Sequence, residues 1–251
     1  MEALLVGKLL SFAMVLTRIS AFFLFVPVFG SKSIPMTVKV AATMLLSVFF
    51  YLTNPTAAAV EEVSAVRVML ILGGEATYGL ALGVIANVLF SIVKLGGRIA
   101  EHQMGLSMAQ ILDPMTDEHG QPVGSLLEII FIIAFLAANG HHLLIKVIHR
   151  SYELFPAGKI PTAASLASNM LAATSTMLVA GLRLAAPMLA VLLILLIALA
   201  ILARMVPEMN IFFISFPLRI VLGLVMLVLF VPFIDGFIGE MSQLMARILP
   251  L

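Results

Sequence analysis

Cysteine and tryptophan are both absent from this chain. Without cysteine there can be no disulfide framework, no thiolate metal site and no cysteine nucleophile. Without tryptophan, only the three tyrosines are left to form the aromatic belt that often marks the faces of a membrane. These two absences leave the compartment open, but they remove several classes of site.

Charge is the second scarcity. Charged residues make up 11% of the 251 residues and hydrophobic residues 62%, so the chain lacks the polar surface that a soluble globule of this length needs. A lipid bilayer is its natural surrounding. The net charge of +1 and the scattered Lys and Arg residues argue against a nucleic-acid partner. No cleavage site follows the first apolar run, so we expect that run to stay in the protein as a helix.

Four or five apolar runs reach the length of about 20 residues that a helix needs to cross a bilayer. They are Leu9 to Phe29, Val68 to Val93, Leu126 to Ile148, Leu184 to Ala203 and Ile211 to Ile234, the last broken by Pro217 and Arg219. The run from Val38 to Leu52 is shorter, which favours a re-entrant or hairpin helix. Thr162 to Arg183 is rich in small residues and predicts a packing helix, with a kink after it at Pro187. The sequence therefore predicts an all-α membrane protein.

Proline and glycine interrupt nearly every apolar run. The interruptions are Pro27, Gly73-Gly74, Pro187, Pro207, Pro217 and Pro232. In hydrocarbon, each break frees backbone groups that must find partners inside protein, so a multi-subunit assembly is expected to surround these helices. Gly79 and Gly83 form a GxxxG pair, which permits close helix approach either within the chain or to a partner.

Charged residues lie inside or near the ends of several apolar runs, among them Arg18, Glu75 and Glu128. An ionised group at the bilayer centre costs roughly 2.5 kcal/mol or more, so Arg18 and Glu75 should face partners or water. Pairing between helices is the structural interpretation. The functional alternative is a secondary transporter that binds an ion and a solute at these three residues, although no convincing pair of matched half-repeats accompanies them.

Signatures of enzymes and metal sites are missing from the sequence, which contains no HExxH, P-loop or GxGxxG motif. The string GLSMA at Gly105 to Ala109 resembles the serine motif of intramembrane proteases, but it lacks the second glycine and a histidine partner. His142, Lys146 and His149 share one helical face, where the lysine would repel a metal ion. We therefore expect no enzymatic activity, no cofactor and no metal, and a polar interface at the histidines.

The longest polar interruption runs from Lys94 to Gly124. Its first half, Ile99 to Leu112, predicts a helix that Asp113-Pro114 ends. Three methionines, Met104, Met108 and Met115, accompany this element, and methionine conforms readily to irregular surfaces. They could fill a core gap or seal a channel. A polar, Gly/Pro-rich segment between membrane helices is tolerated only where it lines a cavity or meets protein, which keeps both interpretations open.

Two strings in the sequence resemble the FliR family. EHQMGLSMAQILDP, Glu101 to Pro114, is similar to its Q-x-G-hydrophobic-S-x-A…DP stretch, and ARMVPEMNIFFISFPLRIVLGL, Ala203 to Leu224, is similar to its R-x-x-P-x-M-N…P-hydrophobic-R/K…G stretch. TRISAFFLFVPVFG and NGHHLLIKVIHRSYELFPAG support the resemblance, which extends over almost the whole chain. The last string favours flagellar over injectisome membership.

The resemblance implies a subunit of a type III export gate in the bacterial inner membrane, at the flagellar basal body. The implied fold is a set of broken helical hairpins in a helical hetero-oligomeric gate, with residues 1–160 FliP-like and residues 161–251 FliQ-like. The implied partners are FliP-type and FliQ-type subunits, FlhB- and FlhA-type export proteins, basal-body rod components, unfolded secreted substrates and lipid.

The resemblance also implies roles for individual residues. A plug within residues 104–122 would close the channel, and the residues assigned to it or its approach are Gln103, Met104, Gly105, Met108, Ile111, Asp113, Pro114 and Met115. Gly105, Gly120 and Gly124 would act as its hinges. Arg204, Pro207 and Asn210 would form a turn between two C-terminal helices and contact a neighbouring subunit.

Overall fold

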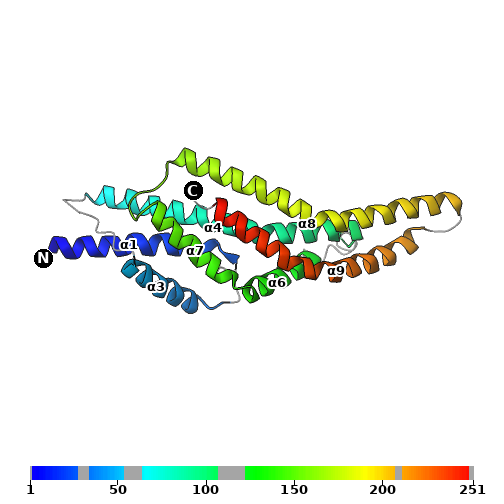
Figure 1. The fold of residues 1–251 in the computed structure, drawn as a ribbon, viewed down its shortest axis with the longest axis horizontal. Helices are drawn as coiled ribbons and strands as arrows, with labels where there is room; N and C mark the ends of the chain where they lie inside the picture. The colour runs from blue at the N-terminus through cyan, green and yellow to red at the C-terminus, as the bar shows by residue number, and fades with distance from the viewer. Residues whose placement is uncertain (1, 28–33, 54–63, 107–121, 207–210, 249–251) are drawn as a thin grey trace, which may run out of the picture. The chain divides into compact units, whose positions relative to one another are not determined.

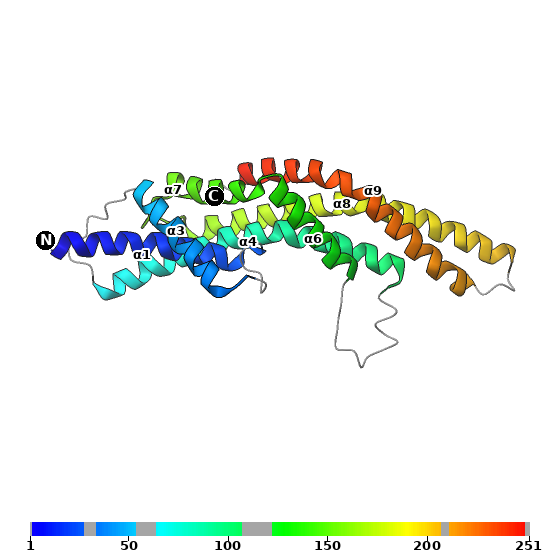
Figure 2. The same cartoon turned by 90° about the horizontal axis from the view of Figure 1, so that it is seen from below.

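The computed structural model describes residues 2–27, 34–53, 64–106, 122–206 and 211–248. Its helices are α1 (Glu2–Phe25), α3 (Met36–Thr53), α4 (Ala65–Met104), α6 (Pro122–Ala137), α7 (Gly140–Leu154), α8 (Ala163–Met205) and α9 (Ile211–Ile248), as Figures 1 and 2 show. Helices joined by turns account for the described residues, and no strand occurs among them. The predicted all-α class is confirmed.

Five helical segments among the described residues are long and apolar enough to cross a membrane. They are Leu5–Phe25, Met36–Thr53, Ala65–Met104, Ala163–Arg183 and Ala185–Met205. The short run that was predicted to form a re-entrant helix is thus an 18-residue helix, α3, close to the lower limit for a crossing. The chain is a membrane protein.

The apolar run from Leu126 to Ile148 is not one continuous helix, because the structure divides it into α6 and α7, which together still have the length and composition of a broken span. Asn139 lies between them with a left-handed backbone (φ 58°), a conformation that asparagine adopts more readily than most residues. The two helices also differ in character. α6 is mostly apolar with a single charged residue, Glu128, whereas α7 carries its charged residues on one face and buries the other.

Proline interrupts the long helices less than the sequence predicts. The two segments expected on either side of Pro187 form one continuous helix, α8, of 43 residues. Pro217 and Pro232 likewise lie inside α9 rather than ending it. Each proline removes one backbone donor, and helices in membranes tolerate this loss where neighbouring helices or local adjustments satisfy the freed carbonyl.

The chain forms two compact units, each built partly from pieces of the long helices. Unit 1 comprises Met1–Leu89, Asn139–Ser175 and Met241–Leu251, and unit 2 comprises Phe90–Ala138 and Thr176–Glu240. In unit 2, the core is a cluster of rings in which Phe90 packs edge to face on Phe131 and Phe135, at centroid distances of 5.5 and 5.2 Å. Such pairs add to the free energy of burial.

In unit 1, glycines bring α4 into direct contact with the backbone of α1. A Cβ atom at Gly79 would collide with the carbonyl oxygen of Arg18, and one at Gly83 would lie 2.7 Å from that of Phe22. The GxxxG pair therefore serves a contact within the chain. This close approach places the side chain of Arg18 beside α4.

We expect Gly79→Ala to destabilise unit 1, because the added methyl group has no space against α1. Overpacking of this kind costs typically 1 to 3 kcal/mol, outweighing the gain of about 0.5 to 1 kcal/mol in helix propensity. Gly73→Ala is the matched control, since nothing lies within 4 Å of a Cβ at that position of the same helix. Thermal unfolding of the detergent-extracted protein distinguishes them, and equal stability of the two variants would contradict the glycine contact.

Candidate functional site

Arg18 of α1 and Glu75 of α4 form a bidentate ion pair inside unit 1. Arg18 Nε donates to Glu75 Oε2 at 2.6 Å, and Arg18 Nη2 donates to Glu75 Oε1 at 3.0 Å. The side chains are 1% and 0% exposed. Planar two-point pairing of this kind is among the strongest polar contacts available to arginine. Membrane burial of these two charges is therefore compensated within the chain.

The same ion pair fixes the end of α7 and the turn that follows it. Arg18 Nη1 donates to the carbonyl oxygens of Phe155 at 2.9 Å and Ser151 at 3.3 Å, which lie at the C-terminal end of α7. Glu75 Oε1 accepts a hydrogen bond from the backbone N–H of Gly158 at 2.7 Å. A positive charge at a helix C-terminus is also favoured by the helix dipole. One pair of side chains thus joins α1, α4 and α7.

Two tyrosines enclose the guanidinium. Its carbon lies 4.3 Å from the ring centroid of Tyr152 and 4.9 Å from that of Tyr78. Cation–π contact with buried rings is worth about 2 kcal/mol when the cation is desolvated. The Tyr152 hydroxyl donates to the carbonyl oxygen of Val15 at 3.3 Å, whereas the Tyr78 hydroxyl is buried without a hydrogen-bond partner. The cluster leaves no open face at which a solute could reach the charges.

Glu128, the third predicted charge, lies in unit 2, whereas the cluster around Arg18 and Glu75 lies in unit 1. Glu128 of α6 pairs in unit 2 with Lys94 of α4, at 2.8 Å between Oε2 and Nζ. The two side chains are 24% and 35% exposed, so this pair is far less buried than the one between Arg18 and Glu75.

The C-terminal end of α4 forms a glycine cap. Gly105 has a left-handed backbone (φ 81°), its N–H donates to the carbonyl of His102, and the N–H of Leu106 donates to that of Glu101. This pair of bonds is the Schellman pattern, which ends a helix sharply and requires a residue such as glycine at that position. Gly105 therefore terminates α4, and its role as a hinge stays a prediction.

Met104 is the last residue of α4 and is fully buried in unit 2. It lies directly on Gly223 of α9, where a Cβ atom would come within 2.5 Å of its Cγ. Gly105 meets the ring of Phe216 on the same helix. Met104 therefore lies in the core of unit 2. Gln103, the residue before it, is exposed. No pattern in the sequence predicts a contact at Gly223, which was noted only as part of the second family-like string.

Glu101 carries a buried carboxylate one turn before the end of α4. It is 4% exposed, and its Oε2 atom has no hydrogen-bond partner among the residues that the structure describes. An ionised oxygen in this position is costly unless a partner reaches it. The sequence does not single out Glu101, because polar residues adjacent to it in the string hide its burial.

Most of the predicted plug and turn residues fall outside the described ranges. They are Met108, Ile111, Asp113, Pro114, Met115, Pro207 and Asn210. The hinge Gly120 and the serine of the protease-like string, Ser107, fall outside them as well. Arg204 is exposed in the last turn of α8, and Gly124 is buried near the start of α6 against α4.

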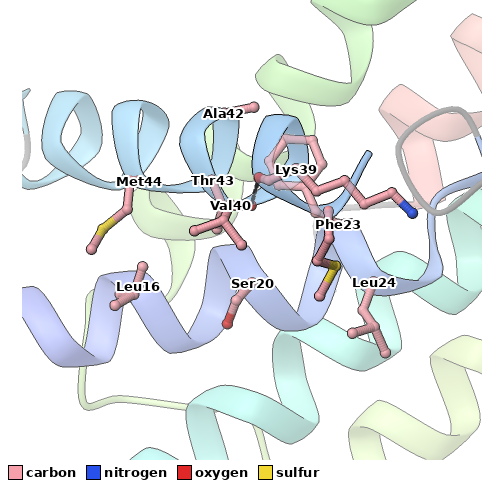
Figure 3. Close-up of a pocket in the computed structure, with 10 residues that line it drawn as sticks. Leu16, Ser20, Phe23, Leu24, Lys39, Val40, Ala42, Thr43 and Met44 are labelled. Carbon is pink, nitrogen blue, oxygen red and sulfur yellow. Dashed lines mark hydrogen bonds between the residues drawn. The ribbon is translucent and has the colours of Figure 1, made fainter. Parts of the chain in front are cut away.

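An apolar groove between α1 and α3 was not foreseen from the sequence. Figure 3 shows it, with Leu16 and Met44 toward one end and Leu24 and Lys39 toward the other. Its volume is about 470 Å³. The hydroxyl of Thr43 in its wall donates to the carbonyl oxygen of Lys39 at 2.8 Å, so this hydroxyl is already satisfied by the backbone. A ligand in the groove would therefore contact mainly apolar side chains.

Together these features define a helical membrane protein with one buried and internally neutralised pair of charges and with a buried, glycine-capped end of α4. The sequence pattern of the family described as Bacterial export proteins, family 1, matches residues 9–245. The chain belongs to this family of bacterial export proteins.

Individual relatives agree with this assignment. The chain is 31% identical to the flagellar biosynthetic protein FliR of Bacillus subtilis, over 87% of this chain and 85% of the relative. It is 29% identical to FliR of Escherichia coli, over 93% and 90%. It is also 28% identical to the Yop proteins translocation protein T of Yersinia pestis, over 88% and 86%. The predicted resemblance to the FliR family is confirmed.

We expect Glu75→Gln to destabilise the protein strongly, because it leaves Arg18 buried without a counter-ion. Breaking a buried pair costs about 3 to 5 kcal/mol. Glu128→Gln is the control, since partly exposed pairs contribute about 0 to 1 kcal/mol. Protein abundance in membranes and the thermal unfolding temperature report the difference. If both variants behaved like the wild type, the buried pair would not support unit 1.

Proposed function

We propose that this protein is a non-enzymatic subunit of a flagellar type III export gate. In this proposal, residues 104–122 close the secretion channel at rest and move aside when an unfolded substrate enters. The observation that carries the proposal is the end of α4, where a buried and capped helix terminus meets a polar segment between two apolar helices. Family membership and the names of the relatives supply the setting.

The chemistry of residues 107–121 supports a channel-facing role. This segment contains charged residues, glycine and proline, and it connects α4 to α6 within a membrane protein. Backbone outside helices is tolerated at membrane depth only against protein or a water-filled cavity. A segment that bridges a channel satisfies this condition in both states, against neighbouring subunits when closed and against water or substrate when open.

The exposed surface of α8 supports a multi-subunit assembly. Only 6% of the apolar stretch within Ala163–Arg183 is buried. The same segment carries serine, threonine and asparagine side chains. Small and hydroxyl-bearing residues favour helix–helix contact over lipid. The partners proposed to cover this surface are FliP-type and FliQ-type subunits, with FlhB- and FlhA-type export proteins and the basal-body rod nearby. The proposed location is the inner membrane at the flagellar basal body.

The C-terminal region supports the proposed division of the chain. Two long helices, α8 and α9, account for most of residues 161–251 and are joined by the short segment 207–210. A single helical hairpin of this kind fits a FliQ-like part that follows a FliP-like part ending near residue 160. Arg204 precedes the connection, where the proposal assigns it, with Pro207 and Asn210, to the turn and to a subunit contact.

The Arg18–Glu75 cluster weighs against the rival function of a secondary transporter. Both side chains are buried, and their polar atoms already bind each other, α7 and the turn after it. A transport site must exchange its ligand with water on each side of the membrane. In the proposed gate the pair is structural, and the energy for export comes from other components of the machine.

Shortening the segment within residues 107–121 should make the channel leak. Removing four to six residues from its middle would leave too little chain to close the path, while the helices on either side keep their packing. The measurement is the uptake of a small solute into cells or vesicles that contain the whole complex, with assembly checked by purification. An assembled complex as tight as the wild type would refute the plug.

Purification from native membranes should distinguish a gate subunit from a transporter. We expect the tagged chain to bring down other, different small membrane proteins in constant proportion, because its exposed helices require protein partners. Native mass spectrometry of the intact complex identifies them and counts the copies. Recovery of this chain only as a monomer or homo-oligomer would contradict the proposal.

A further inference from the structure

Another apolar groove, which we call the α8–α9 groove, lies between these two helices within unit 2. Its volume is about 410 Å³. Pro187 of α8 and Met226, Leu229 and Phe233 of α9 give it an apolar wall. Leu229 is 59% exposed and Phe233 is 71% exposed, so the rest of the chain does not cover this wall. In a membrane protein, an open apolar surface of this kind is covered by lipid or by another protein.

Two charges of opposite sign lie in the same groove. Arg183 of α8 and Glu240 of α9 both line it, and both side chains are exposed. Among the residues that the structure describes, neither of them forms an ion pair or a side-chain hydrogen bond. Charges beside apolar membrane surface are costly until a partner reaches them. A ligand with an anionic group for Arg183 and a cationic group for Glu240 would neutralise both.

The hydropathy of α8 places Arg183 at the level of the lipid headgroups. The segment Ala185–Met205 begins just after this arginine and has the highest mean hydropathy, 3.0, of the candidate spans in the described residues. Its length is about 30 Å, which matches the thickness of the hydrocarbon core of a bilayer. When this segment crosses the membrane, Arg183 therefore lies directly outside the hydrocarbon.

The direction of α9 places Glu240 further from the hydrocarbon than Arg183. Within unit 2, α9 runs back along α8 after the connection 207–210 (Figure 1). Glu240 is further from that connection than Arg183, whereas Met226 and Leu229 are nearer to it and line the groove beside the span. The groove therefore presents an apolar wall, then a cation and then an anion, in order from the hydrocarbon outward.

Phosphatidylethanolamine carries complementary groups in the same order. Its acyl chains lie in the hydrocarbon, its phosphate lies at the edge, and a short ethyl linker joins its ammonium group to the phosphate. Guanidinium groups bind phosphate through paired hydrogen bonds, and carboxylates accept hydrogen bonds from ammonium groups. A lipid whose headgroup is only anionic would leave the carboxylate of Glu240 without a partner and close to a like charge.

We propose that the α8–α9 groove is a binding site for phosphatidylethanolamine. Arg183 binds the phosphate, Glu240 binds the ammonium group, and one acyl chain lies against Met226 and Leu229. The inference concerns the lipid contact alone and does not depend on the proposed export function.

The first test measures lipid binding to the purified full-length chain by native mass spectrometry, with phosphatidylethanolamine and phosphatidylglycerol added in turn. We expect Arg183→Gln to lower the binding of both lipids, and Glu240→Gln to lower only that of phosphatidylethanolamine. Each loss should be roughly fivefold, the usual effect of one charge at a lipid headgroup. Arg219→Gln and Glu153→Gln are charge-matched controls, because neither residue lines the groove, and both should bind lipid as the wild type does.

A variant that leaves both charges in place tests the apolar part of the site. Gly236 lines the groove, and nothing lies within 4 Å of a Cβ atom at this position. Gly236→Leu should therefore fill the groove without disturbing the packing of α9. We expect it to lower the binding of both lipids while the thermal unfolding temperature stays at or above that of the wild type.

Cross-linking in native membranes tests the site in the assembled protein. A phosphatidylethanolamine with a diazirine in its acyl chain should label this chain at peptides that contain Met226 or Leu229, and Gly236→Leu should abolish that label. Labelling elsewhere only would show that protein covers the groove in the assembly, and it would overturn the inference. Equal binding of both lipids by the wild type, or unchanged binding by Arg183→Gln, would overturn it as well.

Discussion

The buried pair of Arg18 and Glu75 is the interaction on which unit 1 depends. In a low-dielectric interior, burying either charge without a partner costs a large amount of free energy. The same low dielectric strengthens the ion pair and the hydrogen bonds that it forms with the end of α7. Because the guanidinium binds two carbonyl oxygens as well as the carboxylate, it can occupy only one arrangement of α1, α4 and α7. The pair is therefore better understood as a determinant of geometry than as a source of net stability.

Glycine provides the second constraint, and it acts in several ways. In unit 1, Gly79 and Gly83 let two backbones touch, which is what brings Arg18 within reach of α4. In unit 2, Gly223 accepts a side chain rather than a backbone, and Gly105 supplies a backbone conformation. Glycine thus permits a backbone contact between helices, leaves space for a neighbouring side chain, and ends a helix. Only the three-dimensional structure shows which of these uses applies at a given position.

The helical class and the membrane setting followed directly from composition and run length, because burial of apolar surface and backbone pairing act on every residue of a run. Helix boundaries were harder. The break at Asn139 depends on one residue's backbone, and the continuity of α8 through Pro187 depends on local adjustment, neither of which hydrophobicity encodes. At the site, Arg18 and Glu75 stood out because charges are rare in apolar runs. Gly223 did not stand out, because the residue that it contacts, Met104, is more than a hundred residues away in the sequence.

The sequence distance between the partners of Arg18 has a consequence for synthesis. Glu75 follows Arg18 by 57 residues, and the carbonyl of Phe155 follows it by 137. At a ribosomal rate of about 5 to 20 residues per second, the first helix waits roughly 3 to 11 s for its counter-ion and longer for its remaining ligands. During that interval the nascent helix carries an uncompensated charge. Stable insertion of the first helix therefore requires residues that are synthesised later, Glu75 and Phe155 among them.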